Sequence, residues 1–305
     1  MELQFLGTGA GVPSKERNVT SIALNLLDEL GVYWLFDCGE STQHQILRTP
    51  VKLSKTNKIF ITHLHGDHIY GLPGLLSSRS YQGGVTPLTV YGPAGIAVFI
   101  RQALAISGSH LNYDLCIEEI TSEGILVEEQ GFVVEARRLE HRGECFGYRI
   151  TEPDQTGTLL VDKLQHEGIK PGPIYSQIKQ GGAVELPDGR TIQGEDYVGK
   201  SIPGRVVAIM GDTKPCQAAI ELARDAHVLV HEATFASSHH EHANDFGHST
   251  SAQAAQIAET ANVRTLIVTH ISSRYQGEDV DVLLSEAQAI HKDTYAAADF
   301  WTFRL

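Results

Sequence analysis

Short apolar runs alternate with polar, glycine-rich turns along most of the chain, and their length and spacing predict its secondary structure. In the first half, β-branched and aromatic residues in apolar or alternating runs predict strands at 2–6, 20–27, 32–37, 58–62, 115–120, 125–129, 132–138 and 146–151. Helical patterns lie between them at 73–81 and 93–107, the second with Pro93 near its first turn and Gly108 beyond its end. The first half therefore combines a sheet, with antiparallel content, and two helices.

The second half repeats an alternation of strand and helix. Strands are predicted at 206–210, 228–230, 265–269 and 300–303, and helices at 215–224, 249–261 and 280–291. Alternation of this kind indicates a sheet that is covered by helices. The whole pattern predicts an α/β protein with two sheets flanked by helices.

The regular pattern breaks down between residues 152 and 205, where Gly, Pro and polar residues dominate. Two clusters stand out, at 168–173 and 180–182. A structureless loop of this length is unusual inside a compact domain, so we expect an arm, 152–205, inserted into a single domain that spans residues 1–305. Long exposed segments are either binding elements or tolerated insertions, and composition alone favours neither.

The composition bears on the cellular compartment of the protein. No apolar stretch approaches the roughly 20 residues that span a bilayer, and no basic segment precedes an apolar one at the N-terminus, so neither membrane insertion nor secretion is expected. The cysteines Cys38, Cys116, Cys145 and Cys216 are widely spaced, which argues against a disulfide framework or a zinc knuckle. We therefore expect a cytoplasmic protein.

The net charge of −13 bears on nucleic-acid binding. Proteins that coat nucleic acid non-specifically carry a basic excess, so this class is disfavoured. An enzyme that acts on nucleic acid is not excluded, because two bound dications add about four positive charges where a phosphate must lie.

Residues 60–68 hold the densest cluster of candidate metal ligands. His63, His65, Asp67 and His68 come at the end of the strand predicted at 58–62 or just after it. Imidazole and carboxylate groups bind zinc at neutral pH, and a strand end presents them on a rigid scaffold. The alternative is a solvated loop that is rich in histidine by chance, which the ordered spacing disfavours.

One loop cannot complete a site for two metals, because each zinc takes roughly four or five ligands including water. His141, Asp212 and His270 each stand where a predicted strand gives way to a loop. Taken singly, each is equally well a turn residue or a helix cap. Together they favour convergence on one edge of the sheets.

The order of these residues resembles that of the metallo-β-lactamase superfamily over essentially the whole chain. The resemblance implies an αββα sandwich of two mixed sheets with a dinuclear metal site at the sheet edge. It implies that one zinc is held by His63, His65 and His141 and the other by Asp67, His68 and His270, with Asp212 bridging. Asp37 matches the superfamily's first motif and would orient a ligand by hydrogen bonding, although a turn cap is its simpler role.

Four further features resemble the short form of the ribonuclease Z family, the tRNA 3′-processing endonucleases. Residues 13–18 match the family's Pro-x-Lys-x-Arg-Asn loop, 231–234 its His-Glu-Ala-Thr motif and 248–250 its His-Ser-Thr loop. The insertion lies where that family carries an arm that grips tRNA. By this resemblance the candidate contacts of the arm are Gly168, Lys170, Pro171, Gly172 and Pro173.

The resemblance also implies a reaction. Hydroxide would attack a phosphodiester of a tRNA precursor, leaving a tRNA 3′ hydroxyl and a trailer with a 5′ phosphate. Asp67 would hold the nucleophile and accept its proton, and His248, supported by Glu232, would donate a proton to the departing 3′ oxygen. The alternatives are an ordinary carboxylate at Glu232 and a capping-region residue at His248.

The 13–18 and 248–250 loops are expected to bind substrate. Lys15 and Arg17 offer two cations to a phosphate or a base edge, with Asn18 beside them, unless they are a solvated charge pair. Ser249 and Thr250 are assigned to the substrate by resemblance, and Ser249 is also a candidate N-cap of the helix that follows.

The family's assembly implies a homodimer in which the arm of one subunit grips precursor tRNA for the active site of the other. Two zinc ions per subunit are expected, and Mn²⁺ or Fe²⁺ would fit the same ligands. No membrane or DNA partner is expected. Two other functions stay open: a hydrolase of small phosphodiesters or thioesters, and a non-catalytic RNA-binding protein stabilised by metal. The first has no use for Lys15, Arg17 or an arm, and the second needs no base or acid.

Overall fold

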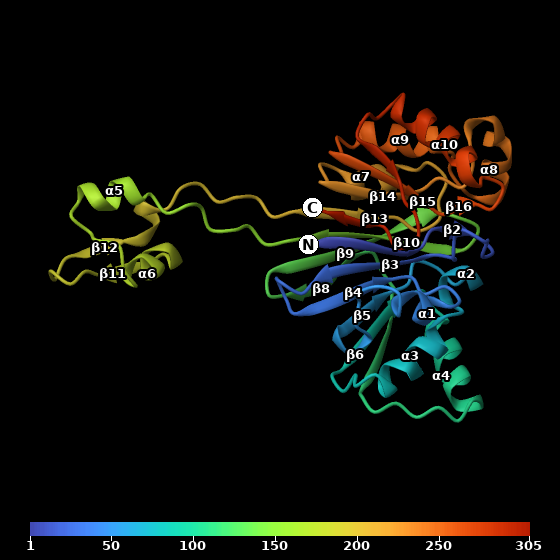
Figure 1. Ribbon diagram of the computed structural model, residues 1–305, viewed down its shortest axis with the longest axis horizontal. Helices are drawn as coiled ribbons and strands as arrows, with labels where there is room; N and C mark the ends of the chain where they lie inside the picture. Colours follow the sequence, from blue (N-terminus) through green and yellow to red (C-terminus); the bar gives the residue numbers. More distant parts are fainter. The chain divides into compact units, whose positions relative to one another are not determined.

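The computed structural model describes all of residues 1–305 and divides the chain into two compact units (Figure 1). The main unit consists of Met1–Ile150 and Val206–Leu305, and the arm unit consists of Thr151–Arg205. The arm unit thus covers the segment in which the regular pattern of the sequence breaks down.

The main unit contains two sheets of seven strands each. In the first sheet the strand order is β18-β1-β3-β4-β5-β6-β7. Its members are β1 Glu2–Gly7, β3 Ser21–Leu26, β4 Val32–Phe36, β5 Thr56–Phe60, β6 Leu88–Gly92, β7 Leu115–Glu119 and β18 Thr302–Arg304. Strands β18, β1, β3 and β4 pair antiparallel, whereas β4 to β7 pair parallel, so the sheet is mixed.

The second sheet is also mixed and has the order β17-β15-β14-β13-β10-β9-β8. Its members are β8 Gly124–Glu129, β9 Phe132–Glu140, β10 Glu144–Thr151, β13 Val206–Ile209, β14 Val228–Glu232, β15 Thr265–Thr269 and β17 Thr294–Ala296. Strands β13, β14, β15 and β17 run parallel, and β8 and β9 form an antiparallel pair. A separate parallel pair joins β2 Gly9–Ala10 to β16 Ile271–Ser272.

Helices cover the outer face of each sheet. Figure 1 shows α3 and α4 beside the first sheet and α7, α9 and α10 beside the second. The helices of the main unit are α1 Thr42–Ile46, α2 Gly66–Ile69, α3 Leu72–Tyr81, α4 Ile96–Ile106, α7 Gln217–Ala223, α8 His240–Phe246, α9 Ser251–Thr260 and α10 Val280–Gln288, with short 3-10 turns η1 Leu53–Lys55, η3 Ser237–His239 and η4 Gly277–Asp279. The predicted αββα sandwich is therefore confirmed.

Alternation along the strands explains why both sheets are apolar on both faces. In β4, Trp34 and Phe36 belong to the core between the sheets, while Tyr33 and Leu35 pack toward the helices. Successive side chains of a strand point to opposite faces, so a strand covered on both sides must be a continuous apolar run. A side chain such as Trp34, with no exposed surface, contributes about 3 kcal/mol by burial.

Some predicted elements differ from the structure for identifiable reasons. Strand β6 was not predicted, because its five residues lie between two helical patterns and directly after Pro87. The helix predicted at 249–261 begins at Ser251, and its N-cap is Thr250, whose side chain accepts a bond from the Gln253 backbone in a capping box. Ser249 as N-cap is therefore wrong.

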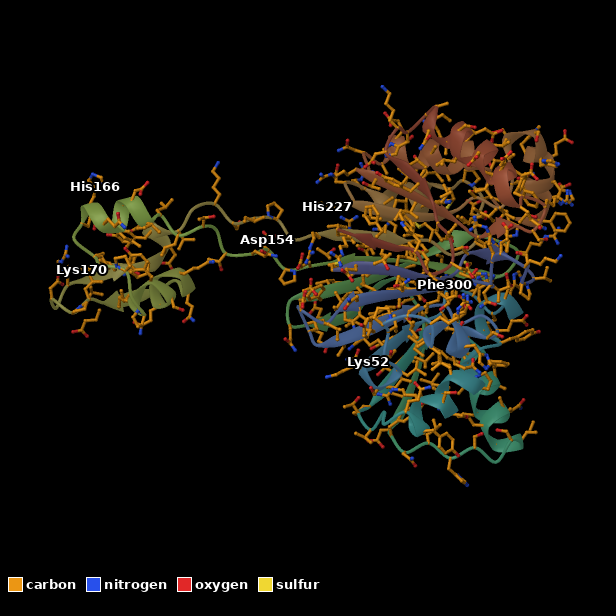
Figure 2. All side chains as sticks on the ribbon, viewed as in Figure 1. Lys52, Asp154, His166, Lys170, His227 and Phe300 are labelled. Carbon is orange, nitrogen blue, oxygen red and sulfur yellow. The ribbon has the colours of Figure 1, made fainter.

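The arm unit has secondary structure and a small core of its own, which the pattern of residues 152–205 did not predict. It contains α5 Val161–His166, α6 Ile174–Gln180, the hairpin of β11 Ala183–Glu185 and β12 Thr191–Gln193, and the turn η2 Gly194–Tyr197. Its core consists of Leu164, Ile169, Ile178, Val184, Leu186 and Tyr197. These apolar residues are widely spaced in the sequence, which hides their periodicity. Figure 2 marks two of the exposed side chains, His166 and Lys170.

None of the helices has the length and apolar character that crossing a membrane requires.

Candidate metal and catalytic site

The candidate ligands converge because each follows a buried strand. Asp37 comes directly after β4, His141 after β9 and His270 after β15. The His63 to His68 loop follows β5, and Asp212 follows β13. A strand that is packed on both faces is rigid, so the side chains at its end are held in fixed positions.

Three histidines and one carboxylate form the first donor group. His63 Nε2 lies 3.0 Å from His65 Nδ1, and His141 Nε2 lies 3.3 Å from the same atom. Asp212 Oδ2 is 3.6 Å from His63 Nε2. The donor atoms of these four residues all lie within 4.8 Å of one another.

Asp67, His68 and His270 form the second donor group. His68 Nε2 and His270 Nε2 are 3.4 Å apart, and they lie 3.5 and 3.3 Å from Asp67 Oδ2. Asp212 Oδ2 also lies 3.5 Å from His68 Nε2 and 3.3 Å from His270 Nε2. One oxygen of Asp212 is therefore shared between the two groups.

Hydrogen bonds on the far side of the imidazoles turn Nε2 toward the centre. His141 Nδ1 donates to the Gly247 carbonyl at 2.7 Å. The Thr62 hydroxyl donates to Asp37, so its oxygen accepts from His63 Nδ1 at 3.0 Å. In the same way the Thr234 hydroxyl donates to Glu232, and its oxygen accepts from His270 Nδ1 at 2.9 Å.

His68 is oriented by a carboxylate rather than a hydroxyl. Its Nδ1 donates to Asp37 Oδ2 at 2.7 Å, and Asp37 also accepts from the Thr62 backbone N–H at 2.7 Å. With Nδ1 of His63, His68, His141 and His270 bonded on the far side, the Nε2 atoms of these residues face one another. Neutral imidazoles arranged in this way are the donors that a divalent metal binds, and the carboxyl oxygens of Asp67 and Asp212 complete the set.

The electrostatics of the site favour bound positive charge. Burial lowers the pKa of His63 well below its usual value and also lowers the pKa of His141, which keeps both imidazoles neutral. Burial opposes protonation of His68 as well, but Asp212 and Asp37 together raise its pKa well above the usual value. The same carboxylates would stabilise a metal cation at this place.

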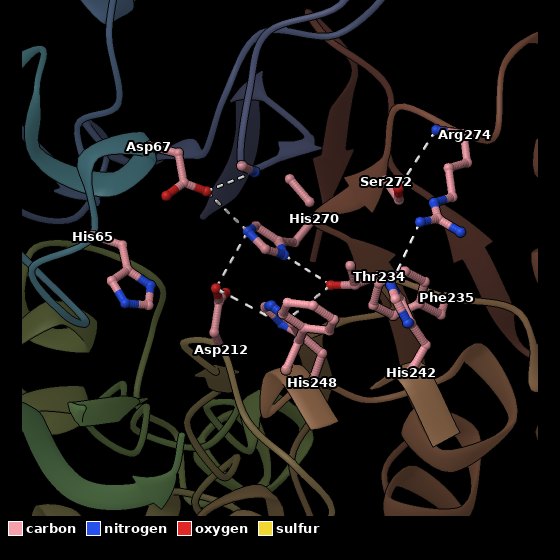
Figure 3. A pocket seen from close by; sticks show the side chains of 13 residues that line it. His65, Asp67, Asp212, Thr234, Phe235, His242, His248, His270, Ser272 and Arg274 are labelled. Atoms are coloured by element: carbon pink, nitrogen blue, oxygen red, sulfur yellow. Dashed lines mark hydrogen bonds and ion pairs between the residues drawn. The ribbon is translucent and has the colours of Figure 1, made fainter. Parts of the chain in front are cut away.

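Asp67 is held by the backbone of the N-terminal segment. The Gly11 N–H donates to Asp67 Oδ2 at 2.8 Å. In Figure 3 a dashed line joins this oxygen to His270, while the other oxygen of Asp67 has no dashed partner among the residues drawn.

His248 and Glu232 form a pair beside the second donor group. His248 Nδ1 donates to Glu232 Oε1 at 2.9 Å, and Glu232, the last residue of β14, is buried. Glu232 also accepts from the backbone N–H groups of Thr213, Thr234 and Ser249. Burial lowers the pKa of His248, but the adjacent Glu232 carboxylate raises it to about 9, so the ring is protonated at neutral pH.

The site opens into a pocket of about 270 Å³ (Figure 3). His65, Asp67, Asp212, His248 and His270 line it together with Phe235, His242, Phe246 and Arg274. The sequence did not predict these last four residues, because isolated aromatic and basic residues outside a motif do not indicate a site.

Gly247 and Arg142 tie the His141 loop to the end of α8 and were also missed. Gly247 has φ 78° and a Cβ there would lie 3.0 Å from His141 Nδ1, so a glycine is needed at this position. The Arg142 guanidinium donates to the Asp245 carbonyl and lies over the Phe246 ring, 4.5 Å from its centroid. Only a main-chain carbonyl and a stacking contact are involved, and neither leaves a sequence pattern.

The 13–18 loop is built differently from what the sequence suggested. Arg17 Nη1 donates to Thr8 Oγ1 at 2.7 Å and to the Ala297 carbonyl at 2.5 Å, so its charge is turned inward. Asn18 Nδ2 donates to the Glu40 carbonyl at 2.9 Å. Arg17 is therefore not a free cation, because the loop folds back through a bond from Ser14 N–H to the Arg17 carbonyl; binding of substrate by the loop stays a prediction. Of the two cations, only Lys15 is exposed.

Ser249 and Thr250 are buried, and each bonds within the chain. The Ser249 hydroxyl donates to the Thr213 carbonyl at 2.7 Å, and Thr250 caps α9. The structure thus turns both side chains inward, and contact of the 248–250 loop with the substrate stays a prediction.

The predicted contacts of the arm lie between α5 and α6. Gly168 has φ 78° and ends the α5 turn, and Pro173 precedes α6. Lys170, Pro171 and Gly172 are exposed.

The fold and the His/Asp cluster define the class as a metallo-β-lactamase-fold hydrolase. The chain is 58% identical over 303 residues to ribonuclease Z of Bacillus cereus (strain G9842), covering 99% of each chain. It is 59% identical over 303 residues to ribonuclease Z of Bacillus thuringiensis (strain Al Hakam), again over 99% of each. The chain therefore belongs to the ribonuclease Z family, whose members are metal-dependent tRNA 3′ endonucleases.

Solved structures agree with this assignment. Human tRNase Z, short form, matches with a TM-score of 0.73 and 28% identity, covering 100% of this chain and 99% of that chain. The metallo-β-lactamase fold protein YhfI from Bacillus subtilis matches with a TM-score of 0.69 at 18% identity, over 99% and 98%, which supports the fold. A family model described as anti-Pycsar protein Apyc1 matches residues 1–136.

Proposed function

We propose that this protein cuts tRNA precursors with two zinc ions per subunit, leaving a tRNA 3′ hydroxyl and a trailer with a 5′ phosphate. The observation that carries the proposal is the set of inward-facing Nε2 atoms around Asp212 Oδ2, within 3.3 to 3.6 Å for His63, His68 and His270. His63, His65 and His141 would hold one ion, and Asp67, His68 and His270 the other, with Asp212 bridging. Asp37 would orient His68.

Zinc in these positions supplies a water of lowered pKa and positive charge beside the phosphate. Asp67 provides the general base, because it lines the pocket and only one of its oxygens is fixed by Gly11 and the second donor group. The proton of the attacking water passes to that carboxylate.

His248 provides the general acid. Its Nδ1 is bonded to Glu232, so the proton on Nε2 is the one that can be given to the departing 3′ oxygen. With a pKa of about 9, raised by Glu232 against the effect of burial, nearly all of the His248 side chains carry that proton at neutral pH. Glu232 positions the ring through its bond to His248; four further bonds, from Thr213, Thr234 and Ser249, hold the carboxylate, which does not touch the substrate.

The arm unit would bind the body of the tRNA, and the protein would act as a homodimer in the cytoplasm. A separately packed core and the exposed Lys170 support a binding role for the arm. Lys15 is the remaining exposed cation of the 13–18 loop and is assigned to the RNA. All four cysteines are free, which fits a reducing compartment.

Metal removal and replacement test the proposal. Purified protein should contain close to two zinc ions per chain, lose cleavage of a 3′-extended tRNA after dialysis against a chelator, and regain it with added Zn²⁺. A histidine outside both donor groups gives a control: His291, buried beside Glu259, can be replaced, and His291→Ala should keep both zinc ions and the cleavage activity. Full activity of metal-free protein would contradict the proposal.

A further inference from the structure

A carboxylate near the C-terminus binds three segments that are far apart in the sequence. Asp299 Oδ1 accepts from the Thr8 hydroxyl at 2.8 Å. Its Oδ2 accepts from the Asn18 backbone N–H at 2.7 Å and from Gln45 Nε2 at 2.9 Å. The carboxylate thus joins the end of β1, the 13–18 loop and α1.

Arg17 makes a second connection within the same cluster. Its guanidinium donates to Thr8 Oγ1 and to the Ala297 carbonyl, so Thr8 accepts from Arg17 and donates to Asp299. Gly9 N–H also donates to the Asn18 carbonyl at 2.8 Å. A Cβ at Gly9 would lie 3.2 Å from both Arg17 Cβ and the Asn18 oxygen, so the two segments pack without space for a side chain.

Residues 8–11 reach from this cluster to the second donor group on two sides. The Thr8 carbonyl accepts from Ile271 N–H at 2.9 Å, and β2 pairs with β16, which begins directly after His270. His270 itself has φ 53°, a backbone conformation that its neighbours must hold in place. On the other side, Gly11 N–H donates to Asp67 Oδ2 at 2.8 Å.

We propose that Asp299 is a positioning residue that fixes residues 8–11 through Thr8 and Asn18, and thereby orients Asp67 and His270. This inference rests on the proposed metal site. The C-terminal segment then acts on the reaction only by holding residues 8–11 in place, and Arg17 has the same positioning role. The first donor group, His63, His65 and His141, has no such connection to residues 8–11.

The test uses Asp299→Ala and Asp299→Asn in the full chain, with Asp293→Asn as the matched control. Asp293 is a carboxylate of the same C-terminal region that accepts from the Thr265 hydroxyl at 2.5 Å and lies outside the cluster. Apo protein is titrated with Zn²⁺ against a chromophoric chelator. Loss of a partner behind a metal ligand lowers metal affinity by about 10- to 100-fold, so one of two zinc ions should bind Asp299→Ala at least tenfold more weakly while the other keeps its wild-type affinity.

Hydrogen exchange of the metal-free variants gives a second measurement. The Gly11 and Ile271 amides should exchange faster in Asp299→Ala than in the wild type, while amides of β13 and β14 stay unchanged. Asp299→Asn keeps the shape but offers an N–H₂ to at least one donor, so it should show the same changes to a smaller extent.

Three results would overturn the inference. The first is wild-type exchange at Gly11 and Ile271 in Asp299→Ala, whatever the zinc count. The second is an equal loss of both zinc ions, and the third is an effect no larger than that of Asp293→Asn. If instead the wild-type protein itself binds fewer than two zinc ions, the proposed metal site fails, and the exchange data still decide whether Asp299 holds residues 8–11.

Discussion

The donor groups of the main unit and the proposed binding surface of the arm unit are built in different ways. In the main unit the candidate ligands follow packed strands, and a partner holds the outer nitrogen of four of the histidines, as Asp37 holds His68 and Thr234 holds His270. In the arm unit six apolar side chains form a small separate core, and Lys170 is exposed to solvent without such partners. We infer that packing of the main unit sets the rate of the chemical step, while the arm sets affinity for RNA. Changes in the two units should therefore affect kcat and KM separately.

The largest effect is expected from Asp212→Ala. One oxygen of Asp212 serves both donor groups, so its loss should weaken both metal positions and lower kcat for precursor cleavage by about 10⁴-fold or more. Zinc content and single-turnover cleavage measure this. Precursor tRNA binding should stay within about threefold, and an equally large loss of binding would mean that site and arm do not act separately.

His248→Ala should lower kcat by about 10³-fold while leaving zinc content and KM nearly unchanged, because it removes a proton donor and no metal ligand. The pH profile gives the sharper result. The Glu232 carboxylate, against the effect of burial, raises the pKa of His248 to about 9, so the protonated acid is lost and the wild-type rate should fall as the pH rises through about 9. That alkaline fall should be absent in His248→Ala. If the variant keeps it, another group is the acid.

A substitution in the core of the arm unit tests whether the arm sets the affinity for RNA. Ile178 is fully buried in α6, and Ile178→Ala should destabilise the arm unit by about 2 to 4 kcal/mol. KM for precursor tRNA should rise about tenfold, while hydrolysis of a small phosphodiester stays within about twofold. Ile202→Ala is the control, since Ile202 belongs to the same unit and is 52% exposed. A loss of small-substrate turnover in Ile178→Ala would show that the arm fold also supports the metal site.

The smallest effect is expected from a single exposed charge. Lys170→Ala should raise KM about threefold at low salt and less at high salt, because a phosphate contact releases about one counterion. Lys52→Ala in the main unit is the matched control; Figure 2 marks both residues, and both are exposed. An equal effect of the two substitutions would assign the change to net charge and not to the arm.

The sequence predicted the sandwich and the strand ends well, because both depend on local patterns. A run such as that of β15 must be buried on both faces, and the first polar residue after it, His270, then lies at the sheet edge. The ligand-rich loop from His63 to His68 is visible in the same way. These features need no knowledge of distant contacts.

The sequence could not show which side chains turn inward. Arg17 and Asn18 look like substrate ligands in a basic motif, yet they bond to Ala297, Asp299 and Glu40, which lie far away in the sequence or contribute only a carbonyl. The fold of the arm unit was still harder to predict from the sequence, because its core residues occur one at a time in a polar segment. Bonds from main-chain atoms, such as those of Gly11 and Gly247, leave no trace in residue types.

The chemical identity of the cleavage products tests the account most directly. A precursor tRNA labelled at an internal position is cut with purified protein, and the new ends are mapped and analysed. Attack by water, assisted by Asp67 and His248, predicts a tRNA ending in a 3′ hydroxyl and a trailer that begins with a 5′ phosphate. A 2′,3′-cyclic phosphate on the tRNA with a 5′ hydroxyl on the trailer would contradict it, because those ends arise when the neighbouring ribose hydroxyl is the nucleophile.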